Sequence, residues 1–367
     1  MPRVYFNPHA RNRIDEQASG RAPMRFHERL PGYAATPLVE APSIARRVGI
    51  ASVLVKDESS RLGLPAFKVL GASWATYQLA IHRLGREPAW ETLDELRAAF
   101  APLRPLALMT ATDGNHGRAV ARVAKLFGFD ARIFVPLGTV QARIDAIASE
   151  GASVTVVDGS YDDAVRRAAN EAGERCIVVS DTSWEGYTDV ARWVADGYST
   201  IMHEIDDALA AISSPPPDLV VTQIGVGSLA VAMIRHARGS DAAQPARVIG
   251  VEPDAAGCAM ASVEAGRIVS VETGETVMAG LNCGTLSMIA YPTLRDGIDA
   301  FVTVDDARAL EAMRALAAEG IVSGETGASG AAGLIEALEG PHSDELRARL
   351  HITRETRALV ISTEGAT

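Results

Sequence analysis

The chain has 367 residues, of which 47% are hydrophobic, and its 35 basic against 46 acidic side chains leave a net charge of −11. A chain of this length and hydrophobicity can bury a large core and exceeds the usual size of one domain, so we expect two lobes. The acidic balance argues against nucleic acids and anionic membranes as partners, because both are bound through clustered lysine and arginine.

Other broad classes are also excluded by the sequence. No apolar run approaches the roughly 18 residues that a membrane helix needs, and the first residues lack the apolar stretch of a secretory signal. The cysteines Cys176, Cys258 and Cys283 show no CxxC spacing. We therefore expect a cytoplasmic protein without a disulfide framework, and leave open whether Cys258 and Cys283 pair.

From residue 50 onward, short β-branched runs alternate with alanine-rich segments of helical spacing. Buried strands are predicted at 52–56, 106–112, 131–136, 153–157, 176–180, 218–224, 246–253, 300–304 and 357–363. Residues 1–50 are rich in proline and arginine, and we predict an irregular segment there. Strand–helix alternation predicts an α/β fold with mainly parallel sheets, whose ligands bind beyond the carboxyl ends of the strands.

The basic side chains are almost all arginine, and the lysines are Lys56, Lys68 and Lys125. Lys68 follows Phe67 and precedes the small residues of GAS. A lysine in such surroundings can be desolvated, which lowers its pKa and makes the amine nucleophilic. Lys68 is therefore the best candidate for a Schiff base, the alternative being a surface lysine at the start of a helix.

Two predicted strands are followed by acidic and amide side chains. Asp113 and Asn115 follow the 106–112 strand, where a carboxylate can exchange protons and an amide can bond a ligand. Asp181 follows the 176–180 strand in the segment DTSWEGY, which is typical of a binding loop. Helix capping is the alternative for both aspartates.

The segment Gly225-Val226-Gly227-Ser228 follows another strand and precedes a helix. Such a turn binds phosphate through backbone N–H groups and the helix dipole. It matches neither GxGxxG nor the P-loop, so a small phosphorylated cofactor fits as well as a nucleotide. Ser362 ends the last strand and could contact a ring nitrogen, or could belong to an ordinary turn. HExxH and Cys/His ligand spacings are absent, so we expect no metal site.

Taken in order, these motifs resemble the fold-type II pyridoxal-phosphate enzymes, the tryptophan synthase β-like superfamily, and within it the diaminopropionate ammonia-lyases. The segments that carry the resemblance, between residues 56 and 365, are KDESSRLGLPAFKVLGASWA, TATDGNHGRAVA, SYDDAV, SDTSWEGYTDV, QIGVGSLA, VMAGLNCGT, SGETGASG and STEG. Threonine dehydratases and cysteine synthases typically have Ser-Gly-Asn where this chain has Asp113-Gly114-Asn115.

The resemblance implies an architecture of two lobes, each with a mainly parallel twisted sheet flanked by helices, with the cofactor in the cleft. Residues 1–80 and 219–367 would form the large lobe that binds pyridoxal phosphate, and residues 81–218 a small inserted α/β lobe. Members are usually homodimers.

The resemblance also implies roles for individual residues. Lys68 would hold pyridoxal phosphate as a Schiff base, and Asp113 would take the Cα proton of a D substrate, with Asp181 or Lys68 serving the L substrate. The remaining implied contacts are Asn115 to the cofactor O3′, Gly225, Val226, Gly227 and Ser228 to the phosphate, Ser362 to the pyridine nitrogen, and Tyr161, Ser73 and Thr112 to the substrate.

The implied reaction is α,β-elimination of 2,3-diaminopropionate, as the D or L isomer or both, to pyruvate and ammonia. One departure is that the family commonly has Asp and a further tail after STEG, whereas Ala366 follows here. A related β-eliminating lyase or dehydratase acting on serine, threonine or another β-substituted amino acid is the first alternative. A non-catalytic protein that binds a phosphate or nucleotide is the remote one.

Overall fold

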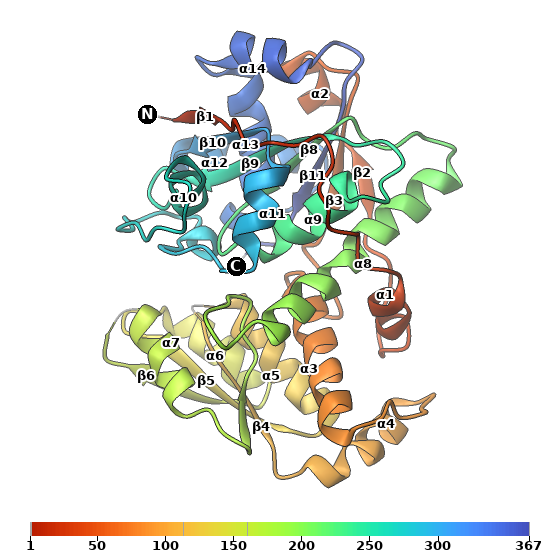
Figure 1. Ribbon diagram of the computed structural model, residues 1–367, viewed down its shortest axis with the longest axis vertical. Coiled ribbons are helices and arrows are strands. Elements are labelled where there is room, and N and C mark those ends of the chain that lie inside the picture. Colours follow the sequence, from red (N-terminus) through yellow and green to blue (C-terminus); the bar gives the residue numbers. More distant parts are fainter. Residues whose placement is uncertain (1, 113, 160, 367) are drawn as a thin grey trace.

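The computed structural model describes residues 2–112, 114–159 and 161–366 and contains two sheets covered by helices (Figure 1). The larger sheet has seven strands in the order β1-β10-β9-β8-β11-β3-β2. Its strands are β1 Val4–Phe6, β2 Leu38–Glu40, β3 Ser52–Asp57, β8 Leu219–Gln223, β9 Arg247–Pro253, β10 Ala300–Val304 and β11 Arg357–Ser362. The central strands are parallel, and the short edge strands β1 and β2 are antiparallel to their neighbours.

The smaller sheet has four parallel strands in the order β6-β5-β4-β7. They are β4 Ala107–Ala111, β5 Asp130–Pro136, β6 Ser153–Val157 and β7 Cys176–Val178. The strands of the larger sheet therefore come from residues 4–57 and 219–362, and those of the smaller sheet from residues 107–178. The lobe boundaries at 80/81 and 218/219 stay a prediction.

Helices cover both faces of each sheet. On the larger sheet, α2 Pro42–Val48, α12 Asp306–Ala318, α13 Glu325–Glu339 and α14 Ser343–Leu350 share one apolar cluster, and α9 Ser228–Arg238, α10 Cys258–Glu264 and α11 Ala290–Gly297 lie on the other face. On the smaller sheet, α7 Tyr161–Asn170 covers one face and α5 Asn115–Phe127 the other. The remaining helices are α1 Ala22–His27, α3 Lys68–Leu84, α4 Leu93–Ala99, α6 Gln141–Ser149 and α8 Asp189–Ala211, with 3-10 turns η1 Ala101–Leu103 and η2 Ala279–Leu281.

The predicted α/β fold is confirmed, and each predicted strand coincides with an observed one. The expectation of an irregular segment over residues 1–50 was incomplete, because this region contains α1, α2, β1 and β2. Both strands have three residues, too few for a period-two pattern to be recognised. They form because the edges of a parallel sheet offer unpaired backbone groups.

Helices α3 and α8 approach each other very closely. A Cβ atom on Gly71 of α3 would lie 2.6 Å from the Tyr198 Cε1 atom of α8, and one on Gly197 would lie 2.5 Å from the Leu70 carbonyl oxygen. Only glycine permits this contact. The first turn of α3, which begins at Lys68, is therefore held tightly against α8.

A buried ionic network joins α8 to β3 and to the segment after it. Glu204 accepts hydrogen bonds from Lys56 Nζ and Arg61 Nη1, each at 2.6 Å, and from the Tyr33 hydroxyl at 2.7 Å. Arg61 also donates to Glu58 at 2.5 Å. The two cations and two carboxylates are almost fully buried and balance in charge. Because Arg61 lies seven residues before Lys68, the network also holds the chain that leads into α3.

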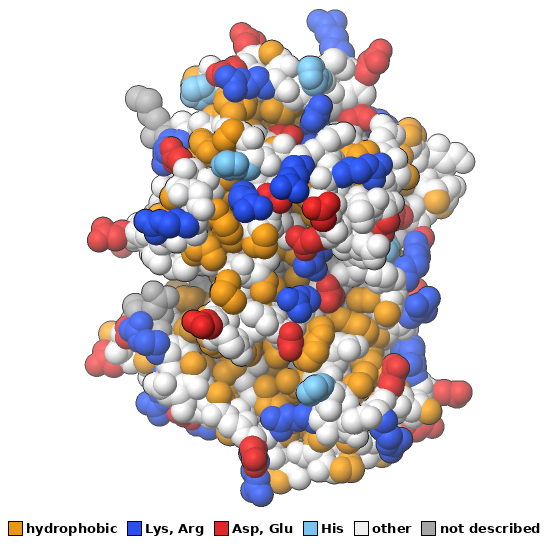
Figure 2. All heavy atoms as spheres, in the orientation of Figure 1, with side chains coloured by type: hydrophobic (Ala, Val, Ile, Leu, Met, Phe, Trp, Pro, Cys, Tyr) orange, Lys and Arg blue, Asp and Glu red, His pale blue; other side chains and the backbone are white. Residues whose placement is uncertain are grey.

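The surface carries both signs of charge. Acidic and basic side chains are interspersed over the face shown in Figure 2. Within the described residues, no helix has the length and apolar character needed to cross a membrane.

Candidate active site

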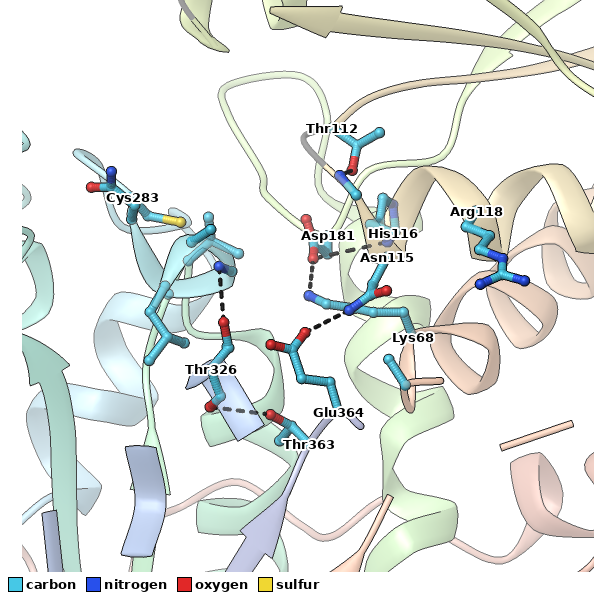
Figure 3. A pocket seen from close by; sticks show the side chains of 18 of the residues that line it. Lys68, Thr112, Asn115, His116, Arg118, Asp181, Cys283, Thr326, Thr363 and Glu364 are labelled. Atoms are coloured by element: carbon cyan, nitrogen blue, oxygen red, sulfur yellow. Dashed lines mark hydrogen bonds and ion pairs between the residues drawn. The ribbon is translucent and has the colours of Figure 1, made fainter. Parts of the chain in front are cut away.

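A cavity of about 630 Å³ lies where the carboxyl ends of strands from both sheets meet. Lys68, Asn115 and Asp181 line it together with the loop between β8 and α9 (Figure 3). Parallel strands place the residues that follow them at one edge of each sheet, so residues far apart in sequence converge here.

Lys68 and Asp181 form the central ion pair of this cavity. Lys68 is the first residue of α3, and its Nζ lies 2.6 Å from Asp181 Oδ2. Burial favours the neutral amine, but the Asp181 carboxylate outweighs this and holds the pKa of Lys68 above its usual range. Burial likewise opposes the charge on Asp181, yet Lys68, through its charge and its hydrogen bond, keeps the pKa of this carboxyl well below its usual range. Both groups are therefore charged at neutral pH.

His116 of α5 lies beside this pair. Its Nε2 lies 2.9 Å from the Val179 carbonyl oxygen, which can only accept, so Nε2 carries the proton. Its Nδ1 faces Asp181 Oδ2 at 3.9 Å. Burial lowers the pKa of His116, so the ring is neutral at pH 7. His116 also lines the cavity.

The loop Gly225–Ser228 forms a narrow cradle at the amino end of α9. Gly227 has φ +101°, which favours glycine, and a Cβ atom there would lie 2.7 Å from Ala290 Cβ. A Cβ atom on Gly225 would lie 3.0 Å from the Gly280 carbonyl oxygen. Ser228 begins α9 and donates a hydrogen bond to the Asp181 carbonyl oxygen. The cradle is thereby joined to the loop that carries Asp181.

Asn115 joins the two sheets across the cavity. It begins α5, and its Nδ2 donates to Glu364 Oε2 at 2.6 Å (Figure 3). Thr112 and Tyr161 also line the cavity. Thr112 Oγ1 accepts the backbone N–H groups of Gly114 and Gly117 at 3.0 and 3.2 Å, which shapes the turn before α5.

Two predicted site residues are not among those that line the cavity, and a third lies outside the described residues. Ser362 is buried at the end of β11 and donates to Ser323 Oγ at 2.8 Å. Ser73 is buried in α3, 3.1 Å from His27 Nε2. Asp113 is not among the described residues, so its predicted role stays a prediction.

Comparison with known proteins identifies the family. A family model described as pyridoxal-phosphate dependent enzyme matches residues 29–362. The diaminopropionate ammonia-lyases of Salmonella typhimurium and Escherichia coli K12 are each 36% identical to this chain, over 95% and 96% of it and 89% of their own lengths. The chain belongs to the diaminopropionate ammonia-lyases. A crystal structure of the Escherichia coli diaminopropionate ammonia-lyase in complex with D-serine superposes with a TM-score of 0.90 at 34% identity, covering 100% of this chain and 94% of that one.

The predicted family and cofactor are thereby confirmed, and the cavity fits pyridoxal phosphate. Lys68 presents an amine to the cavity, and Asn115 presents an amide. The 225–228 cradle offers backbone N–H groups at the amino end of α9, as a bound phosphate requires, and Gly225 and Gly227 allow the loop to lie close against its neighbours, where a Cβ atom would be crowded. The residues present therefore suit an aldehyde, a ring hydroxyl and a phosphate.

Several cavity residues were not predicted from the sequence. They are Gln223, Thr326, Thr363, Glu364, Cys283, Arg118 and Arg143. Thr363 and Glu364 directly follow Ser362, so the motif STEG located the right turn but not which hydroxyl faces the cavity. Cys258 and Cys283 form no disulfide within the part of the chain that the structure describes.

Proposed function

We propose that this chain is a pyridoxal-phosphate-dependent ammonia-lyase that converts 2,3-diaminopropionate and water into pyruvate and two molecules of ammonia. The observation that carries the proposal is the Lys68–Asp181 pair at 2.6 Å, which lines the same cavity as the 225–228 cradle. The named activity of relatives with 36% identity supports the choice of substrate.

The cofactor would be held by this chain's own groups. Lys68 Nζ would form the Schiff base, Asn115 would bond the ring hydroxyl, and Gly225, Val226, Gly227 and Ser228 would bind the phosphate. When bound, pyridoxal phosphate supplies the electron-withdrawing ring that stabilises negative charge at Cα. We assign the pyridine nitrogen to a hydroxyl at the end of β11, and favour Thr363, because it lines the cavity whereas Ser362 donates to Ser323.

Asp181 is suited to receive the Cα proton of an L substrate. Its carboxylate is ionised beside Lys68, and it is almost completely buried. Burial raises the pKa of Asp181, and the Lys68 ammonium counteracts this effect. When the Lys68 amine moves away, the effect of burial prevails, so the pKa of Asp181 rises and Oδ2 becomes a stronger base.

Lys68 is suited to protonate a β-nitrogen that reacts as the neutral amine, whereas a β-ammonium leaves as ammonia without a further proton. Burial lowers the pKa of Lys68, but Asp181 outweighs this effect, so Nζ is protonated at neutral pH while the two groups are paired. Asp113 would serve as base for the D isomer. The Asp181 and Glu364 carboxylates on the cavity wall favour a substrate with a second ammonium group over a hydroxyl amino acid.

The test is an absorbance spectrum followed by a substrate panel. Wild-type protein is expected to be yellow, to lose the colour with borohydride, and to release pyruvate from D- or L-diaminopropionate. Lys68→Ala should lose both colour and activity, while Lys125→Ala, which changes an exposed lysine, should keep both. An active Lys68→Ala protein would overturn the assignment.

A second candidate substrate class is serine and other β-substituted amino acids. The Escherichia coli relative was crystallised in complex with D-serine, so a member of this class binds that protein. Comparing pyruvate release from serine and from diaminopropionate decides between the two. Assembly as a homodimer and location in the cytoplasm are further parts of the proposal.

A further inference from the structure

Away from the cavity, two histidines and one aspartate meet between α8 and α9. His203 and Asp206 belong to α8, and His236 belongs to α9. Each residue offers one atom that could bind a metal, a histidine ring nitrogen or a carboxylate oxygen, and these three atoms lie within 4.8 Å of one another. We propose that His203, Asp206 and His236 form a binding site for a divalent transition metal, with Zn²⁺ as the best match.

The positions of the three side chains follow from the helices. His203 and Asp206 are three residues apart and share one face of α8, which packs against α9 (Figure 1). His236 Nε2 lies 3.0 Å from Asp206 Oδ2. In a tetrahedral zinc site with bonds of about 2.0–2.1 Å, ligand atoms lie about 3.3 Å apart. The His236–Asp206 pair is close to this spacing, and because all three ligand atoms lie within 4.8 Å of one another, closing the site needs movements of no more than about 1.5 Å.

His203 is held as metal-binding histidines usually are. Its Nε2 lies 2.8 Å from the Ser19 carbonyl oxygen. A carbonyl oxygen only accepts, so Nε2 carries the hydrogen and Nδ1 keeps a free lone pair. Such an outer hydrogen bond to a carbonyl group orients the ring and makes the ligand more basic. The two imidazole rings meet edge to face, with centroids 5.5 Å apart.

The donor set selects the class of metal. Two imidazoles and one carboxylate suit Zn²⁺, Ni²⁺ or Cu²⁺, whereas Mg²⁺ and Ca²⁺ prefer oxygen ligands. Three protein ligands would leave a fourth position for water.

The metal site is separate from the cavity. His236 lies about 12 Å along α9 from Ser228 of the phosphate cradle, at 1.5 Å per residue. The ion would therefore clamp α8, α9 and the Ser19 segment together and stabilise the fold without joining the reaction.

The test is a titration of the dialysed holoenzyme with Zn²⁺ by calorimetry, followed by thermal unfolding with and without the ion. We expect one Zn²⁺ per chain and a higher Tm. His236→Gln and Asp206→Asn should each weaken binding at least about ten-fold, because even loss of an outer-sphere partner costs about that much. His9→Gln, which changes an exposed histidine, and Asp207→Asn, which changes the neighbouring acid of α8, should bind as wild type does.

Co²⁺ provides a second measurement that does not depend on a variant. Wild-type holoenzyme with Co²⁺ should show the visible absorption bands of tetrahedral cobalt with nitrogen and oxygen ligands. Absence of Zn²⁺ binding, or equal binding by wild type, His236→Gln and Asp206→Asn, would overturn the proposal. Activity and cofactor absorbance should stay unchanged in both variants without metal. If one variant does not fold, the other and the cobalt spectrum decide.

Discussion

Replacing Glu204 by glutamine should strongly destabilise the protein. Glu204 accepts hydrogen bonds from Lys56, Arg61 and Tyr33, and its side chain has no exposed surface. The substitution preserves shape but removes the negative charge. Lys56 and Arg61 would then remain buried with Glu58 as their partner, so one positive charge would be uncompensated in the core.

Two estimates of the magnitude agree. Removing one partner of a buried ion pair typically costs about 3–5 kcal/mol. Burial by itself raises the pKa of Glu204, but Arg61 and Lys56 lower it from 4.5 to about 2. At about 1.4 kcal/mol for each tenfold change, this corresponds to about 3 kcal/mol at neutral pH. Because the pKa is lowered on folding, this contribution is complete above pH 4.5 and disappears as the pH falls toward 2.

The assay is urea unfolding of the holoenzyme at pH 7 and at several lower pH values. Asp207→Asn on the same helix is the matched control, because its ion pair with Arg21 is about half exposed and should be worth less than about 1 kcal/mol. The difference between wild type and Glu204→Gln should shrink as the pH falls from 4.5 toward 2. A loss at pH 7 no larger than that of Asp207→Asn would refute the reasoning.

Three further predictions concern the cavity. Asp181→Asn should lower kcat for L-diaminopropionate by about 10²–10⁴-fold and affect the D isomer less, measured as pyruvate release; equal losses would contradict separate bases. Gly227→Ala should weaken pyridoxal-phosphate binding, measured by cofactor absorbance, whereas Gly138→Ala, which has a similar backbone angle in open space, should not; equal affinities would argue against the cradle. Thr363→Val should shift the cofactor absorbance more than Ser362→Ala does. The reverse order would indicate that Ser362, not Thr363, bonds the pyridine nitrogen.

Much of the fold and site follows from the sequence because short-range patterns carry them. β-branched runs predicted each long strand, since buried parallel strands are continuously apolar. Asn115, Asp181 and the glycines near 227 were found because each follows a predicted strand, where sites in parallel sheets lie. Lys68 was found because lysines are few in this chain and this one stands among apolar and small residues. Their individual roles stay predictions. Which of Ser362 and Thr363 faces the cavity could not be read from the sequence, since that depends on how β11 is oriented beside α13.

The sequence by itself determined the α/β class, the family and the lysine that can form a Schiff base, because these depend on local composition and on motifs along the chain. Tertiary structure alone decided which distant groups meet. Lys68 and Asp181 are 113 residues apart, yet pair at 2.6 Å. His236 has no metal-ligand spacing to His203, but packing of α8 on α9 brings them together. Spacing rules describe ligands on one segment, whereas these contacts depend on how helices and sheets pack.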